Sequence, residues 1–307
     1  MASSVLRHTF ETRDEARPAF LANHHFDSRR WDAISFRSDD IVISSWAKSG
    51  TTWLQQIVCQ LVHDGREGLD ISALSPWVDF RITPIDQVRA ALEAQPHRRV
   101  MKSHLPADSL PLERQVRYLY IAREPADVVW SWYRHHHEFT DEAYEKLNST
   151  PGRVGPPLER PDSDFRAYFR RWLAEDGHPF HPYWSNVGSW WERRRESNIR
   201  LVHFADLRRS LESELRRLAD FLSLRPSPES WGKILRHCSL DHMKANAELV
   251  APLGGAIFKG GAASFIRSGR RRQWEGLLDE EDLAHCLREA ARRLPADCVA
   301  WLFDRDD

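Results

Sequence analysis

The first strand that the sequence predicts spans residues 40–45. The segment that follows it contains a cationic residue, small residues and hydroxyl side chains. Residues 46–53 (WAKSGTTW) lead from this strand into a predicted helix. The N-terminus of a helix presents unpaired N–H groups and a positive dipole end to an anion. Thr51 and Thr52 add hydroxyl donors and Lys48 adds a cation, so the segment predicts a phosphate site. An ordinary strand-to-helix turn is the alternative. The lysine of this segment comes before its glycine, whereas an ATP-type P-loop has the order GK[ST].

A second candidate anion site follows the strand predicted at residues 116–122. Arg123 stands at the end of this strand, and Pro125 suits the first turn of a helix because it lacks an N–H. Ser131 comes nearly two turns later. An arginine fork and a hydroxyl on one side can hold a phosphate monoester. A surface ion pair for Arg123 and a packing role for Ser131 are the alternatives.

A candidate base follows the strand predicted at residues 99–102. Lys102 and His104 are two residues apart, so they point the same way if the strand pleat persists. An unperturbed histidine has a pKa suited to taking a proton near neutrality. A surface or core role for His104 is the alternative.

These motifs together resemble the cytosolic-type sulfotransferases, which use 3′-phosphoadenosine 5′-phosphosulfate (PAPS) as donor. Residues 48–53 (KSGTTW) resemble the loop that binds the 5′-phosphosulfate, although Trp46 and Ala47 replace the family's Tyr-Pro. Residues 123–131 match R-x-x-x-D-x-x-x-S, which binds the 3′-phosphate, with Asp127 as a structural residue. Residues 102–106 (KSHLP) are similar to K-T-H-L-P, whose histidine is the general base.

Two further segments resemble the family less closely. Residues 265–274 are similar to R-K-G-x-x-G-D-W, with Ser268 in place of the lysine. Residues 238–244 resemble T-S-F-x-x-M-K, which borders the adenine, with Leu240 in place of the aromatic residue. Phe204 stands where the family has a tyrosine that binds adenine.

The resemblance implies the following roles. The catalytic residues are His104 as general base, with Lys48 and Lys102 balancing charge. The residues that bind the donor are Lys48, Ser49, Gly50, Thr51, Thr52, Trp53, Arg123, Ser131, Phe204, Ser239, Leu240, Met243, Arg267, Ser268 and Gly269. Nothing in the resemblance requires a metal.

The acceptor pocket has three candidate residues: Trp77, Phe80 and His135. His135 lies four residues after Ser131, so both occupy one face of the predicted helix. Surface or core packing is the alternative for each of the three. Residues 135–137 are all histidines, but consecutive helical residues point about 100° apart and cannot readily share one metal ion.

Strands alternate with helices along the chain, which predicts an α/β fold with a central, mostly parallel sheet of four or five strands flanked by helices. The resemblance implies a P-loop NTPase-like sulfotransferase fold. We expect a single domain over residues 1–307, with a core at about 38–275 and a C-terminal helix at about 279–294. Residues 148–164 and 251–272 are rich in proline or glycine and are predicted to be loops.

Composition excludes several classes of protein. The 307 residues include 44 Lys plus Arg and 45 Asp plus Glu, and this balance argues against a nucleic-acid partner. A mean hydropathy of -0.58 and the absence of a long uncharged apolar window argue against a membrane span. The N-terminal residues are charged and do not resemble a secretory signal. Four scattered cysteines indicate free thiols and a cytoplasmic location.

The sequence therefore predicts transfer of a sulfuryl group from PAPS to a hydroxyl, or less readily an amine, of a small-molecule acceptor. An ATP-using P-loop kinase is one alternative. The other is a non-catalytic protein that binds adenosine 3′,5′-bisphosphate (PAP). The sequence does not define the oligomeric state, because the family's C-terminal dimer motif is not found after Trp274.

Overall fold

Four parallel strands form the centre of the computed structural model, which describes residues 18–267 and 269–303. Their order in the sheet is β2-β1-β3-β4, with parallel pairing throughout. The strands are β1 (Ile41–Ser44), β2 (Val100–Lys102), β3 (Arg117–Ala122) and β4 (Ile199–His203). The predicted α/β class, with a parallel sheet flanked by helices, is confirmed. Ser268 lies outside the described residues.

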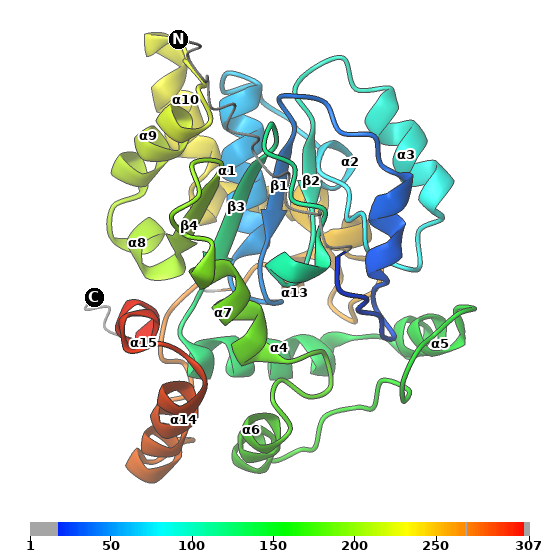
Figure 1. The fold of residues 1–307 in the computed structure, drawn as a ribbon, viewed down its shortest axis with the longest axis vertical. Helices are drawn as coiled ribbons and strands as arrows, with labels where there is room; N and C mark the ends of the chain where they lie inside the picture. Colours follow the sequence, from blue (N-terminus) through cyan, green and yellow to red (C-terminus); the bar gives the residue numbers. More distant parts are fainter. Residues whose placement is uncertain (1–17, 268, 304–307) are drawn as a thin grey trace, which may run out of the picture.

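Helices cover both faces of this sheet (Figure 1). The α-helices are α1 (Thr51–Val62), α2 (Ile71–Leu74), α3 (Ile85–Glu93), α4 (Pro125–Glu138), α5 (Asp141–Ser149), α6 (Phe165–Ala174), α7 (Tyr183–Glu192), α8 (Phe204–Arg209), α9 (Leu211–Phe221), α10 (Trp231–His237), α11 (Leu240–Ala245), α12 (Ala247–Val250), α13 (Gly261–Phe265), α14 (Glu280–Arg293) and α15 (Ala296–Phe303). Short 3-10 helices are η1 (Ser28–Ala33), η2 (Ala107–Ser109), η3 (Pro228–Ser230) and η4 (Pro252–Gly255).

The strands are buried on both faces because their side chains alternate between two cores. Val42, Met101 and Tyr118 belong to a core rich in tryptophan and tyrosine that includes α4, α6 and α7. Ile41 and Ile43 belong to an aliphatic core that includes α1, α9 and α10. Continuous apolar strands of this kind are typical of parallel sheets covered on both sides.

The C-terminal helix expected at about 279–294 is α14. Asp279 caps it: its carboxylate accepts from the backbone N–H of Asp282, whose own carboxylate accepts from the N–H of Asp279. This reciprocal pair satisfies two N–H groups at the start of the helix. In Figure 1, α14 and α15 lie together at one side of the fold.

The prediction that residues 251–272 form a loop is wrong in part, because η4 and α13 lie within it. Gly255 and Gly261 adopt positive φ of 86° and 61°, so glycine joins short helical turns here instead of preventing them. Ala262 and Ile266 anchor α13 in the aliphatic core. The loop predicted at 148–164 begins only after α5 ends at Ser149.

Composition also predicts free cysteines and no membrane span. Cys59, Cys238, Cys286 and Cys298 are all free and buried, as expected. Within residues 18–267 and 269–303, no helix is both long enough and apolar enough to cross a bilayer.

Candidate active site

A cavity of about 750 Å³ opens where the carboxyl ends of β1, β2 and β3 lead into loops. Ligand sites of parallel α/β sheets lie at this edge. The predicted site residues that line the cavity are Lys48, Gly50, Thr51, Thr52, Trp53, Trp77, Phe80, Lys102, His104, Arg123, Ser131, His135, Phe204, Ser239, Leu240, Met243, Arg267 and Gly269. Segments distant in sequence thus meet around one space.

Ser49 is the exception among the described candidates. It is 1% exposed and is not among the residues that line the cavity. Its backbone N–H donates to the carbonyl of Trp46 at 3.3 Å, so it closes the turn between β1 and α1. The prediction that Ser49 binds the donor stays a prediction, because Ser49 is buried beside the cavity and does not line it.

The loop before α1 leaves the N-terminus of this helix open toward the cavity. Gly50 is the N-cap residue, with a φ of 112°, and it supplies no side-chain cap. A Cβ at this position would lie 2.8 Å from Phe204 and 2.9 Å from Ile121. Because no side chain caps the first turn, its N–H groups remain available for an anion.

His104 has a defined proton position. Its Nδ1 lies 2.8 Å from the carbonyl oxygen of Ser45, and a carbonyl can only accept, so Nδ1 carries the proton. Burial, followed by the charge of Lys102, lowers the pKa of His104 well below its ordinary 6.5. The neutral ring therefore presents Nε2 with a free lone pair, the form that a general base requires.

Asp79 supports this arrangement, and no motif in the sequence identifies it. The carboxylate of Asp79 is fully buried and accepts from the indole N–H of Trp77 at 2.6 Å and that of Trp31 at 3.2 Å. It also accepts from the backbone N–H of His104 at 3.3 Å. Asp79 thereby fixes both the histidine backbone and the tryptophan that packs edge-on against its ring at 4.7 Å.

The two lysines reach the cavity from different segments: Lys102 ends β2, and Lys48 lies in the loop between β1 and α1. The ammonium of Lys102 lies 4.4 Å from the ring centre of Trp77, and burial lowers its pKa to about 8, opposed by the charge of Asp79. The ammonium of Lys48 lies over Phe265 at 4.5 Å. Burial lowers the pKa of Lys48 as well, followed by the charges of Arg267, Lys102 and Arg123.

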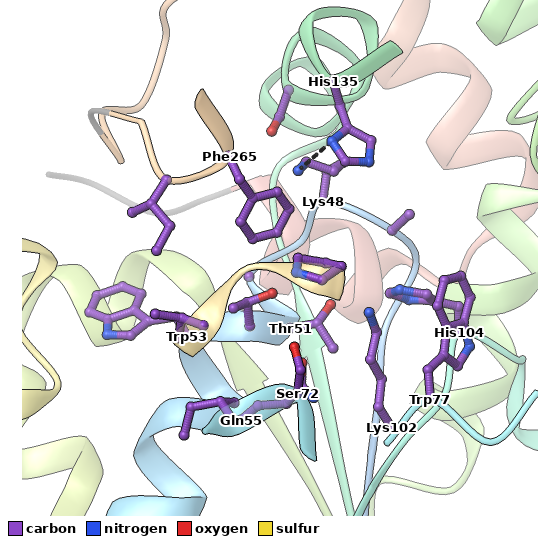
Figure 2. A pocket seen from close by; sticks show the side chains of 18 of the residues that line it. Lys48, Thr51, Trp53, Gln55, Ser72, Trp77, Lys102, His104, His135 and Phe265 are labelled. Carbon is purple, nitrogen blue, oxygen red and sulfur yellow. Dashed lines mark hydrogen bonds between the residues drawn. The ribbon is translucent and has the colours of Figure 1, made fainter. Parts of the chain in front are cut away.

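Figure 2 shows how these side chains divide the cavity. Trp53 lies on one side, and His104 with Trp77 lies on the other. Lys48 and Phe265 lie between them, and Lys48 points toward His135. The predicted base and the predicted nucleoside contact therefore occupy opposite ends of one continuous space.

A second group of cations surrounds the start of α4. The guanidinium of Arg123 donates to Asp127 at 3.1 Å and to the carbonyl of Arg270 at 3.2 Å. Asp127 also accepts from the backbone of Arg272 and from the indole of Trp274, so it joins α4 to the glycine-rich segment. This matches the structural role expected for Asp127.

Arg267 completes this cationic region. Burial lowers its pKa to about 10, followed by repulsion from Arg134. Cations held close together in a partly buried position favour an anionic ligand, because the ligand's charge relieves their repulsion.

The residues expected near an adenine form an apolar slot. The indole N–H of Trp53 donates to the carbonyl of Cys238 at 2.8 Å, and its ring packs edge-on against Phe204 at 5.5 Å. A Cβ added to Gly269 would lie 3.2 Å from Leu240. The hydroxyl of Ser239 caps α11 by accepting from the N–H of His242, so its side chain has a structural role in addition to lining the cavity.

The opposite end of the cavity is aromatic. Trp77 stacks on Phe80 at 4.4 Å, and His135 packs against Phe139 at 4.7 Å and Phe258 at 5.1 Å. Sequence reasoning missed several residues that also line the cavity: His25, Trp132, Phe139, Phe180, Ile257 and Phe258. They come from separate loops and helices and share no motif, so no sequence signal identifies them. No group of three or more His, Cys, Asp or Glu residues in the described part of the chain could hold a metal ion.

Fold and site together define an α/β group-transfer enzyme: an open helix N-terminus, two lysines and a neutral histidine meet at the carboxyl edge of a parallel sheet. The model of the sulfotransferase domain family matches residues 38–294, so the chain belongs to the sulfotransferase family. Its activity is accordingly the transfer of a sulfuryl group.

Characterised relatives agree with this family. A glycolipid sulfotransferase of Mycobacterium bovis is 30% identical over 308 residues, covering 91% of this chain and 92% of the relative. Sulfotransferase 1B1 of Mus musculus is 28% identical and covers 80% of each chain. The structure of mouse sulfotransferase SULT7A1 complexed with PAP superimposes with a TM-score of 0.69 at 19% identity, covering 90% of this chain and 92% of that one.

Proposed function

We propose that this enzyme transfers the sulfuryl group of PAPS to a hydroxyl, in preference to an amine, of an apolar small molecule. One observation carries the proposal. His104 is held as a neutral base with a free Nε2, in the same cavity as Lys48 and Lys102.

The residues present fit the donor. The open N-terminus of α1 suits the 5′-phosphosulfate, with Lys48 as the adjacent cation. Arg123 and Arg267 suit the 3′-phosphate, and Ser131 lines the cavity beside them. Trp53 and the neighbouring apolar residues suit the adenine. Solved structures with this fold are complexed with PAP, including a retinol dehydratase with a TM-score of 0.67.

The proposed reaction is an in-line displacement at sulfur. The acceptor oxygen forms a bond to sulfur while its proton passes to Nε2 of His104. The bond between sulfur and the oxygen of the 5′-phosphate breaks, and its electron pair remains on that oxygen, which gives PAP. Lys48 and Lys102 donate to the oxygens on which negative charge develops, as cations do in phosphoryl transfer.

The acceptor follows from the aromatic end of the cavity. Trp77, Phe80, Phe139 and Phe258 offer rings to an apolar body, while His104 meets its hydroxyl. The name of the Mycobacterium bovis relative specifies a glycolipid, which also combines an apolar part with hydroxyls. A cytoplasmic location suits an enzyme with four free thiols.

The test is transfer of labelled sulfate from PAPS into a metabolite extract, with the product identified by mass. PAP should also raise the melting temperature without added metal. A ligand present at 100 times its dissociation constant raises the free energy of unfolding by roughly 2.7 kcal/mol. An unchanged melting temperature with saturating PAP would reject the donor assignment. Tighter binding of ATP with magnesium would favour the kinase, and PAP binding without turnover of any acceptor would favour a non-catalytic role.

A further inference from the structure

Two buried histidines outside the predicted motifs form a hydrogen-bonded chain that ends in the cavity. Nε2 of His24 lies 2.6 Å from the carbonyl oxygen of Pro179, and Nδ1 of His24 lies 2.5 Å from Nδ1 of His25. The residues His24 and His25 are 3% and 4% exposed. His25 lines the same cavity as His104.

The chemistry of the partners fixes every proton in this chain. The carbonyl of Pro179 can only accept, so Nε2 of His24 is protonated. Burial lowers the pKa of His24 to about 4, so its ring is neutral and its Nδ1 has no proton. Nδ1 of His25 must then donate to it. Burial also lowers the pKa of His25, so that ring is neutral and its Nε2 carries a free lone pair.

The ring of His25 lies at the acceptor end of the cavity. The ring of His25 lies 5.2 Å from that of Phe180 and 6.3 Å from that of Trp77. The ring of His104 lies 5.9 Å and 4.7 Å from the same two rings. Two imidazoles with defined proton positions therefore border the same region, each with an unprotonated Nε2.

The backbone around His25 is held firmly. Its N–H donates to the side chain of Asn23 at 2.8 Å, and its carbonyl accepts from the backbone N–H of Arg81 at 2.8 Å. The guanidinium of Arg81 donates to the carbonyl of Asn23 at 3.1 Å and to that of Pro151 at 2.6 Å. Such support holds a polar group in place before its ligand arrives.

Among the described residues, none donates a hydrogen bond to Nε2 of His25. A ligand that supplies a donor to an unpartnered acceptor in the wall of a cavity gains affinity over one that does not. We propose that His25 is a specificity-determining residue that accepts a hydrogen bond from a second hydroxyl of the acceptor. The substrate class is thus an apolar molecule with at least two hydroxyls: one is sulfated at His104, and the other is bound by His25.

This inference rests on the proposed function, and its test measures binding instead of turnover. The probes are 1-decanol and the 1,2-, 1,3- and 1,4-decanediols, titrated into the enzyme saturated with PAP and followed by calorimetry. They share one apolar chain and differ by one hydroxyl. We expect at least one diol to bind about tenfold more tightly than 1-decanol, as expected for one added hydrogen bond to a buried group.

The variant His25→Phe keeps an aromatic ring and removes the nitrogen. It should abolish the preference for the diol while the dissociation constant of 1-decanol changes by less than about twofold. His25→Gln, whose amide oxygen can accept, should restore part of the preference. His63→Phe, at the C-terminal end of α1, is the matched control and should behave as wild type.

Equal binding of 1-decanol and all three diols by wild type would overturn the inference without any variant. A diol preference that survives in His25→Phe would overturn it too. These outcomes are separate from failure of the proposed function, which would appear as PAPS that transfers no sulfate to any acceptor while the PAP-bound enzyme still distinguishes diol from alcohol.

Discussion

The ammonium Nζ of Lys48 lies 3.3 Å from Nδ1 of His135. When Lys48 is charged, its ammonium can only donate, and Nδ1 of His135 then accepts and carries no proton. This contact joins the loop before α1 to α4 across the cavity (Figure 2). It also distinguishes the two histidines: Nδ1 of His135 is directed at Lys48, whereas Nδ1 of His104 is bound to the carbonyl of Ser45, which leaves Nε2 of His104 unprotonated.

His104→Ala should lower turnover by about 10²-fold or more, the usual size of a general-base effect. His135→Ala should lower it by less than about tenfold, because His135 is not placed to take the proton. Steady-state kcat values of the two variants with one acceptor make the comparison. Both variants should retain the shift in melting temperature caused by PAP. If His135→Ala were the more damaging change, the roles assigned to the two histidines would be reversed.

The dependence of kcat/KM on pH should have an acid limb below pH 6.5 and an alkaline limb near pH 8. Burial lowers the pKa of His104, so the active neutral form persists below its ordinary pKa of 6.5. Burial lowers the pKa of Lys102 to about 8, so this side chain loses its charge as the pH rises through that value. The ratio kcat/KM reports the free enzyme, whereas kcat reports the enzyme with bound substrates. A bound anionic donor favours charged Lys102, so kcat should fall at a higher pH.

The matched variant for the alkaline limb is Lys102→Arg, because arginine does not deprotonate in this range. Its kcat/KM should remain level through pH 8, at a reduced absolute value. The full profile of both proteins between pH 5 and 10 provides the check. An alkaline limb that stays near pH 8 in this variant would assign it to another group, with Lys48 as the first candidate.

The sequence was most informative where a strand runs directly into functional residues. Lys48, His104 and Arg123 each follow a predicted strand, and parallel strands bring their carboxyl ends to one edge, so their meeting follows from topology. The strands themselves could be predicted because a buried parallel strand is a short, continuous apolar run in the sequence.

The residues that sequence reasoning missed act through tertiary contacts. Asp79 stands in an aromatic segment, and only the fold brings its carboxylate to the backbone of His104. His25 gains its proton arrangement from Pro179, more than 150 positions along the chain. Ser49 is a different case: it stands within the motif, yet the turn between β1 and α1 leaves it buried and outside the lining of the cavity.

Gly50→Ala should destabilise the fold by more than about 1 kcal/mol, because alanine is strained at a φ of 112° and its Cβ would overlap Phe204 and Ile121. PAP binding should weaken as well, since the same residue is the N-cap of α1. The control is Gly232→Ala in α10, where an added Cβ meets nothing within 4 Å. That change should leave stability unaltered or raise it by up to about 1 kcal/mol. Urea denaturation of both variants measures the difference, and equal effects would contradict the steric argument.

The two proposed anion sites should differ in their kinetic effects. Arg123 is assigned to the 3′-phosphate, which is distant from the sulfur throughout the reaction, so it contributes equally to the ground and transition states. Arg123→Ala should therefore raise the KM for PAPS more than it lowers kcat. Loss of its charged hydrogen bonds should cost on the order of 1.5–3 kcal/mol each. Lys48 is assigned to the charge that develops at the sulfuryl group, so Lys48→Met should lower kcat itself by about 10²–10³-fold.

Adenosine 5′-phosphosulfate, which lacks the 3′-phosphate, provides the control donor. Wild type should use it poorly, and Arg123→Ala should lose little further activity with it, because the group that Arg123 binds is absent. Lys48→Met should lose activity with both donors. Arg123 also donates to Asp127, so the melting temperature of the unliganded variant must be measured to separate binding from folding. Equal losses with both donors in a well-folded Arg123→Ala would mean that the arginine acts on the sulfate, and the 3′-phosphate would have to be placed elsewhere in the cavity.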